Sequence, residues 1–200
     1  HHRPSEDPFM KENFGTYRYD IMYNDFVLIG PKNTNATFKN LADFFIEAGK
    51  FGTFRFISRG DDSGTHKKEI ELWNAFTYRN PSGEWYIEIG SGMGAALNMA
   101  SATNSYTLSD RGTWLSFKNK GDLEIKWAGD LIMQNPYGLI LVNRDVFPHI
   151  KSTQAKIFAN WLISSKGQKA IGDFKVDGKQ LFCPNADKTN TKSLLACPAN

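Results

Sequence analysis

The sequence predicts an α/β fold with a largely parallel sheet. Short runs rich in β-branched and aromatic residues alternate along the chain with segments whose apolar residues recur at helical spacing. A chain of 200 residues also buries enough surface for an ordinary core in one or two domains. Its longest apolar run, residues 137–142, is far shorter than the ~20 residues that a membrane span needs.

Six runs are expected to form strands, because β-branched and aromatic residues dominate them. They are Phe26–Ile29, Phe54–Ile57, Tyr86–Ile89, Tyr106–Leu108, Leu123–Trp127 and Leu139–Val142.

Four segments repeat apolar residues at the spacing of a helix. In the first, Asn40 is placed to cap the start and Gly49 to end the helix. Gly167 is expected to break the last one. The apolar positions are Leu41, Phe44, Phe45 and Ala48; Ile70, Trp73 and Phe76 after Thr65; Met93, Leu97 and Ala100 after Ser91; and Ile157, Trp161 and Leu162 from about Thr153. The tryptophans Trp73, Trp114, Trp127 and Trp161 lie in or beside these segments and are expected in the core.

Two turn-rich stretches, residues 30–33 and 134–138, indicate changes of chain direction. Taken as crossings between two lobes, they place residues 33–134 in one compact lobe. Residues 1–32 and 135–200 then form the other.

Charge and cysteine content argue against two classes of function, nucleic-acid binding and zinc binding. Lys and Arg number 24 against 21 for Asp and Glu, and the basic residues are scattered, so a nucleic-acid partner is not expected. A zinc site is not expected either, because the only two cysteines, Cys183 and Cys197, have no nearby ligand, the nearest histidine being His149. A disulfide, worth about 3 kcal/mol, is favoured over two free thiols and indicates an extracytoplasmic compartment.

The stretch Ser58–Glu69 carries the chemistry. It follows a predicted strand and opens a predicted helix, which is where open α/β sheets bind ligands. Backbone N–H groups at a helix start, hydroxyls of Ser63 and Thr65, and the close approach that Gly64 allows together suit an oxyanion. Arg59 adds a planar set of donors that stays charged.

Asp61 or Asp62 is expected not to contact the anion, because a carboxylate aimed at a dianion would repel it. It would instead cap the helix or fix Arg59 by a salt bridge. The plainer alternative is that Asp62 and Ser63 only cap a helix. A cap, however, does not need Arg59 or Gly64.

A second strand-to-helix junction, Ile89–Gly94, is rich in glycine. It matches neither nucleotide-binding motif, so its glycines are expected to serve tight turning and close helix packing. Ser91 and Gly92 stay a possible second set of donors facing the same anion.

A catalytic interpretation rests on Ser63 and His66, three residues apart, with Asp61 nearby. No Gly-x-Ser-x-Gly elbow surrounds the serine. We therefore expect His66 to be a solvated helix residue, followed by Lys67 and Lys68 on a wet face.

These motifs, taken together, closely resemble the tungstate-binding proteins of bacterial ABC importers. The resemblance runs from about His1 to Asn185 and is carried by Ser58–His66, Met22–Val27, Gly30–Pro31, Gly92–Gly94, Tyr106–Thr113 and Asn135–Gly138. The spacing of Arg59 to Ser63–Thr65 is also similar to that of periplasmic phosphate-binding proteins.

The resemblance implies a type II periplasmic-binding-protein fold, whose two lobes close on a tetrahedral oxyanion. Tungstate or molybdate would be bound by Arg59, Ser63, Gly64 and Thr65, with Ser58 a weaker candidate. It also implies no metal or organic cofactor, an ABC-transporter permease as partner, a monomer, and a periplasmic location with or without a lipid anchor. The family's Thr/Ser-rich loop from a first strand is not found in this sequence, so the first lobe is expected to be incomplete.

Two other functions stay open. An enzyme acting on a phosphorylated or other anionic substrate would use Ser63 or His66. A degenerate lobe would act only through protein contacts.

Overall fold

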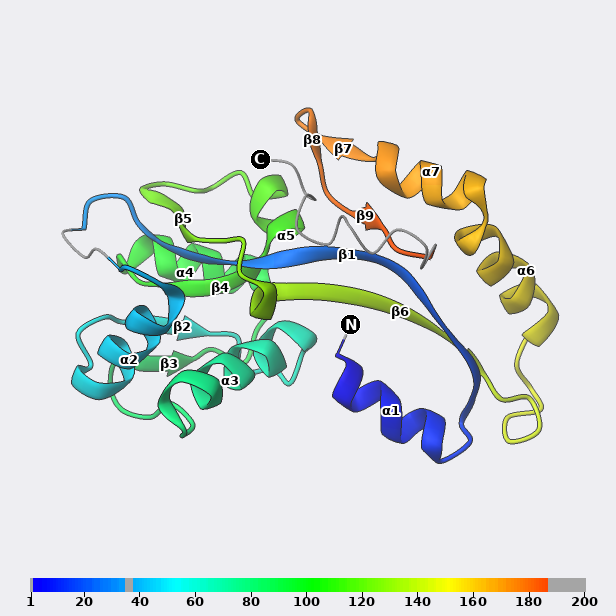
Figure 1. Ribbon diagram of the computed structural model, residues 1–200. Helices are drawn as coiled ribbons and strands as arrows, with labels where there is room; N and C mark the ends of the chain where they lie inside the picture. The colour runs from blue at the N-terminus through cyan, green and yellow to red at the C-terminus, as the bar shows by residue number, and fades with distance from the viewer. Residues whose placement is uncertain (1, 35–37, 187–200) are drawn as a thin grey trace. The chain divides into compact units, whose positions relative to one another are not determined.

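The computed structural model describes residues 2–34 and 38–186 (Figure 1). Contacts within the chain divide it into unit 1, His1–Asn24 with Asn135–Asn200, and unit 2, Asp25–Gln134. The first passage between the units therefore lies inside β1 (Gly15–Pro31), not in the turn at residues 30–33. The reason is that one strand runs without a break through both units. No helix of the described ranges is both long and apolar enough to cross a membrane.

Unit 2 is built on a mixed sheet. β2 (Phe56–Ser58) runs parallel to β3 (Tyr86–Glu88), and a parallel bridge from Phe56 to Tyr106 joins β2 to β4 (Thr107–Asp110). β1 runs antiparallel to both of its neighbours in this unit, β4 and β5 (Leu123–Trp127). The prediction of a largely parallel sheet is thus wrong at β1, because apolar periodicity does not encode strand direction.

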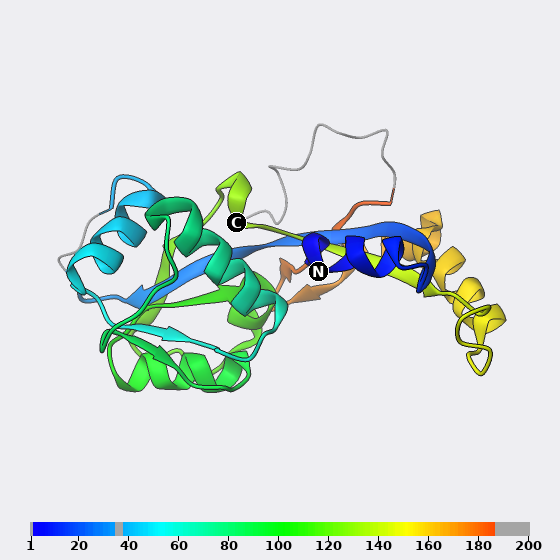
Figure 2. The same ribbon diagram turned by 90° about the horizontal axis from the view of Figure 1, so that it is seen from below.

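Alternating residues of β1 face opposite sides of this sheet. Phe26 and Leu28 pack with α2 (Leu41–Phe51) and α3 (Gly64–Thr77). Val27 and Ile29 pack with α4 (Met93–Ala102) and α5 (Arg111–Ser116). The two helix pairs therefore cover opposite faces of the sheet (Figures 1 and 2), and the strand buries both of its sides.

The start of α2 is as predicted, and its end is not. The Asn40 side chain accepts the Asp43 N–H at 2.9 Å, which caps the helix. Gly49 lies inside the helix, which ends two residues later, at Phe51. Gly52 adopts the left-handed conformation that glycine tolerates best, with φ 59°.

Unit 1 combines the first half of β1 with elements from both ends of the chain. β1 pairs with β6 (Gln134–Val142) and, at Met22 and Tyr23, with β9 (Cys183–Pro184). The other elements are α1 (Arg3–Lys11), α6 (Ser152–Ile163), α7 (Ser165–Asp173) and the strand pair β7 (Lys175–Val176) and β8 (Lys179–Gln180). A single turn of 3-10 helix, Leu131–Met133, precedes β6 in unit 2. The sequence patterns did not predict α1, α5 or the first half of β1.

The expectations for the last helix are corrected in two ways. The break falls at Ser164, whose side chain accepts the Gly167 N–H, and not at Gly167. Gly167 is instead buried in the first turn of α7, where a Cβ would lie 2.2 Å from the Trp161 carbonyl oxygen. Trp161 and Ile157 are not in a core: they are 46% and 65% exposed.

Cys183 is buried and disulfide-bonded. Cys197, the only other cysteine in the sequence, lies outside the described residues.

Candidate oxyanion site

The loop between β2 and α3 is held in a fixed conformation. Gly60 and Asp62 both have a left-handed backbone, with φ 58° and 56°. A Cβ on Gly60 would lie 2.8 Å from the Glu88 Cβ on neighbouring β3, so glycine is required by space as well as by backbone angle. The loop thus turns tightly against the adjacent parallel strand.

Arg59 is fixed by Asp61. Its Nε and Nη2 donate to one carboxylate oxygen of Asp61 at 3.2 and 2.5 Å, and Nη1 donates to Thr65 Oγ1 at 3.5 Å. Among the described residues these bonds leave two guanidinium N–H groups for a ligand. Burial alone would raise the pKa of Asp61, but hydrogen bonds from Ser63 and Arg59 outweigh it and hold this pKa below its usual value.

The start of α3 presents further donors. Ser63 caps the helix by accepting the His66 N–H at 3.3 Å, and its own N–H donates to Asp61 at 3.2 Å. The next two N–H groups, those of Gly64 and Thr65, have no acceptor within the part of the chain that is described. These two N–H groups are therefore available to an anion at the positive end of a helix of 14 residues, whereas the Ser63 hydroxyl, predicted as a further donor, is hydrogen-bonded to the Asp61 carboxylate.

Ser58 has different surroundings from the other predicted donors. It is fully buried, its Oγ accepts the Gly60 N–H at 3.2 Å, and its hydroxyl donates to the carboxylate of Glu69. The Ser58 hydroxyl thus points toward Glu69 in the core.

His66 is not the solvated residue that the sequence suggested. Its Nδ1 accepts the Asp62 N–H at 3.1 Å, and its Nε2 lies 3.6 Å from a Glu88 oxygen in a buried position. Lys68 is also mostly covered and donates to the Ile132 carbonyl at 3.1 Å, so this face is not wet. Asp62 itself is exposed and pairs with Lys67 at 3.2 Å.

A serine–histidine catalytic pair does not form. The Ser63 Oγ accepts from the backbone N–H of His66 and not from its ring, and the ring nitrogen Nδ1 is already an acceptor for Asp62. A general base must reach the hydroxyl that it activates. The loop lacks that contact.

The second glycine-rich junction lies beside this loop. The Ser91 N–H donates to the Arg59 carbonyl at 3.1 Å, and Gly92 caps α4 without any side-chain bond. Gly90 has φ 61°, which agrees with tight turning. Close packing does not explain Gly92 and Gly94, since a Cβ on either would meet nothing within 4 Å. The start of α4 is thus open and uncapped next to Arg59.

Two residues beneath the loop, Glu69 and Tyr86, were not predicted from the sequence. The Tyr86 hydroxyl donates to Glu69 at 2.6 Å, and the Glu69 side chain is buried beneath the loop. The available signal was the register of α3, in which residue 69 lies one turn after Thr65 and one turn before Trp73 on the buried face. The spacing of Ile70, Trp73 and Phe76 instead assigned the core face to those three residues, which left Glu69 off that face.

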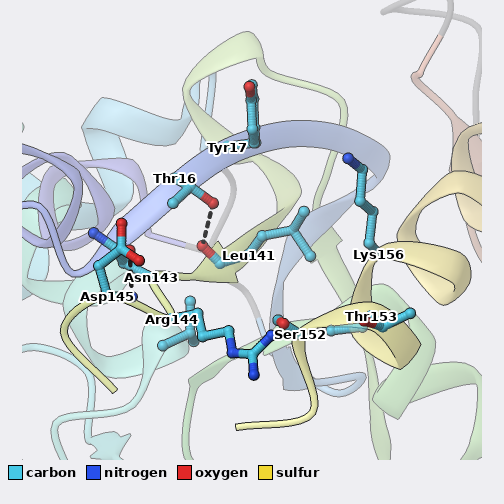
Figure 3. A pocket seen from close by; sticks show the side chains of 11 residues that line it. Thr16, Tyr17, Leu141, Asn143, Arg144, Asp145, Ser152, Thr153 and Lys156 are labelled. Carbon is cyan, nitrogen blue, oxygen red and sulfur yellow. Dashed lines mark hydrogen bonds between the residues drawn. The ribbon is translucent and has the colours of Figure 1, made fainter. Parts of the chain in front are cut away.

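A separate hollow of about 280 Å³ lies in unit 1 (Figure 3). Thr16 donates to the Leu141 carbonyl at 3.3 Å in its wall, and the cations Arg144 and Lys156 line it with Asp145. All three charged residues are exposed, whereas Arg59, Ser63 and Gly64 of the loop after β2 are partly buried and Thr65 is buried.

Comparison with known proteins decides the family. A family model described as a PBP superfamily domain matches residues 1–166 of this chain. The chain belongs to the PBP superfamily. Within it, the chain belongs to the family of the TupA tungstate-binding proteins: it is 42% identical over 194 residues to the tungstate-binding protein TupA of Peptoclostridium acidaminophilum, a match covering 94% of this chain and 68% of that protein.

A solved structure supports the same assignment for this PBP-superfamily chain. The tungstate-binding protein TupA from Desulfovibrio alaskensis G20 is 40% identical, with a TM-score of 0.79, over 94% of this chain and 77% of that one. The fold is accordingly the α/β type II fold of periplasmic binding proteins.

The extent of the match differs between relatives. A protein of Haloferax volcanii, named as a candidate anion-binding protein of an ABC transporter, is 42% identical over 208 residues. That match covers the whole of this chain, which spans 60% of the length of the relative.

Proposed function

We propose that this chain captures tungstate, with molybdate as the competing ligand, for import by an ABC transporter. The observation that carries the proposal is the set of donors after β2: two N–H groups of Arg59 and the N–H groups of Gly64 and Thr65. All are neutral or cationic donors, which suits a dianion with four bare oxygens. Relatives named as tungstate-binding proteins support the same ligand.

The carboxylate oxygens of Asp61 are already occupied, which supports discrimination against protonated anions. Both Asp61 oxygens already accept hydrogen bonds, one from Ser63 and the other from Arg59. A monohydrogen phosphate brings an O–H that needs an acceptor, and leaving it unpaired in a closed site costs affinity. Fully deprotonated tungstate and molybdate carry no such group.

The remaining parts of the proposal concern cellular context. We propose a monomeric protein outside the cytoplasmic membrane that delivers its ligand to a permease, with two lobes that correspond to the two units. A lipid anchor stays a prediction of the sequence. An enzymatic alternative gains no support from the loop, where Ser63 and the His66 ring do not meet.

Titration calorimetry tests the proposal. Purified, anion-stripped protein is titrated with tungstate, molybdate, sulfate and phosphate, and we expect tungstate and molybdate to bind far more tightly than phosphate. Arg59→Ala removes charge-assisted donors worth about 3 kcal/mol, so tungstate affinity should fall about 100-fold. Arg55→Ala, an exposed arginine just before β2, is the matched control and should bind as the parent does. Absence of any heat with tungstate refutes the proposal.

A further inference from the structure

Beneath the oxyanion loop lies a buried carboxyl group that the proposed binding step does not use. Glu69 is 1% exposed. Three donors surround it, each from a different element: the Tyr86 hydroxyl on β3 at 2.6 Å, the Ser58 hydroxyl at the end of β2, and the indole N–H of Trp73 on α3, which faces the carboxylate outside regular hydrogen-bond geometry.

Glu69 is connected to the loop on both sides. Through Ser58, whose Oγ accepts the Gly60 N–H, it holds the first turn of the loop. Along α3 it lies one turn below Thr65, whose hydroxyl accepts from Arg59. A change at the Glu69 carboxyl therefore reaches both the start of the loop and the guanidinium that the ligand would contact.

The electrostatic setting of Glu69 is unusual. Burial and, to a smaller extent, the nearby charge of Glu88 on β3 raise its pKa to about 7 despite the three donors. The facing groups are Ser58 from β2, Tyr86 and Glu88 from β3 and Trp73 from its own helix, so no cation compensates the carboxylate among them. A dianion arriving beside Arg59 adds more negative charge nearby, which favours the protonated carboxyl still further.

We propose that Glu69 is a proton-linked positioning residue: the site takes up a proton on Glu69 as it binds a tetrahedral dianion. This rests on the proposed function of the loop. If binding takes up a proton, the affinity for the dianion falls as the pH rises through neutrality. The reason is that Glu69 is then ionised in the free protein, and protonating it on binding costs more free energy the higher the pH. In the protonated state, Glu69 keeps its contacts to Ser58 and Tyr86 without opposing the ligand charge.

Calorimetry in paired buffers measures the proton directly. Tungstate is titrated at pH 7.5 in two buffers of different ionisation enthalpy, and the difference in heat gives the protons taken up. We expect uptake of a fraction of a proton, and a tungstate affinity three- to tenfold lower at pH 8.5 than at pH 6.5. The upper limit is tenfold if tungstate binding raises the pKa of Glu69 by one unit. Sulfate serves as a second dianion that does not protonate in this range.

Three variants assign the effect. Glu69→Gln should bind tungstate with buffer-independent heat and no pH dependence. Glu71→Gln, on the same helix but exposed, and His66→Asn, which keeps an acceptor for Asp62, should both retain the pH dependence of the parent. Loss of the dependence in His66→Asn would assign the proton to His66 and overturn the proposal.

Infrared titration provides a readout without any substitution. The carbonyl stretch of a protonated, buried carboxyl should disappear as the pH rises through about 7 in the free protein, and at a higher pH with tungstate bound. An unshifted titration, or tungstate binding with buffer-independent heat in the parent, overturns this inference and leaves the proposed function standing. Failure of tungstate to bind at any pH refutes the proposed function itself.

Discussion

The two units bury their helices to very different extents. In unit 2, α2 and α3 each bury four residues, and two hydrophobic clusters fill the two sides of the sheet. In unit 1, α1 buries none of its residues, α6 buries only Ala159, and α7 buries only Gly167. The buried hydrophobic residues of unit 1, within the described ranges, are Ile21, Tyr23, Leu141, Ala159, Leu181 and Cys183.

This difference indicates where the stability of the described structure lies. Aromatic rings pack edge to face around Trp73, with Phe45 and Phe56 at centroid distances of 4.6 and 5.4 Å. In unit 1, Phe158 and Trp161 stack on each other at 6.1 Å but stay 55% and 46% exposed. The oxyanion loop is therefore carried by the unit with the firm core, as a precise binding site requires.

The largest expected effect comes from the same substitution in both units. Trp73→Ala should lower the free energy of unfolding by about 3–5 kcal/mol, because it opens a cavity in a fully buried cluster. Trp161→Ala should cost less than about 1 kcal/mol, since its ring is largely in solvent already. Urea unfolding followed by circular dichroism measures both. Equal costs would show that α6 is covered in solution and would remove the contrast.

The pH dependence of stability should be governed by a buried group of unit 2. The pKa of Glu69 is near the ordinary glutamate value of 4.5 in the unfolded chain and about 7 in the folded one. Between these values the folded state binds more protons, so its contribution falls by about 3 kcal/mol as the pH rises from 4.5 to 7. Glu69→Gln should remove this slope in urea unfolding at a series of pH values, and Glu71→Gln should keep it. Parallel curves for parent and Glu69→Gln would contradict the assignment.

Two serine caps of equal geometry allow a smaller, sharper comparison. Ser63 in unit 2 and Ser164 in unit 1 each accept a backbone N–H at 3.3 Å. Substitution of either by alanine should lower the free energy of unfolding by about 1 kcal/mol. Only Ser63→Ala should also weaken tungstate binding, because the Ser63 hydroxyl is hydrogen-bonded to Asp61, the residue that holds Arg59 in place. Equal tungstate affinities in the two variants would show that the Ser63 side chain does not contribute to the site.

The smallest effect is expected on the exposed face of α6. Ile157→Ser should change the free energy of unfolding by no more than about 0.5 kcal/mol, because the side chain is 65% exposed. Thermal unfolding at two protein concentrations checks this. A loss above about 1 kcal/mol, or a dependence on concentration, would mean that the face is buried in the protein in solution.

The sequence predicted local structure well where a pattern and its cap coincide. The Asn40 cap and the run Leu123–Trp127 lie where the sequence patterns put them, and α3 begins at Gly64, slightly before the position after Thr65 that its pattern indicated. Strand direction at β1 and the exposure of Trp161 could not be predicted, since both depend on which distant element packs alongside. Periodicity identifies an apolar face but not its partner.

The candidate site shows the same division. Arg59, Ser63 and Thr65 follow from the motif between strand and helix. Glu69 and the turned-in hydroxyl of Ser58 do not, because a single Glu on an otherwise mixed helix face resembles a solvated residue until the neighbouring strand supplies Tyr86. The buried Nε2 of His66 was missed for the same reason, since the neighbouring Glu88 comes from β3.

The ion pair between Arg59 and Asp61 affects the thermodynamics of capture. A free arginine side chain loses rotamer freedom worth ~2 kcal/mol when a ligand immobilises it. In this loop that freedom is already lost on folding, because Asp61 and Thr65 hold the guanidinium at 2.5 and 3.5 Å before any ligand arrives. Binding should then show a small entropic penalty from the protein and a fast association rate, because the donors are preorganised.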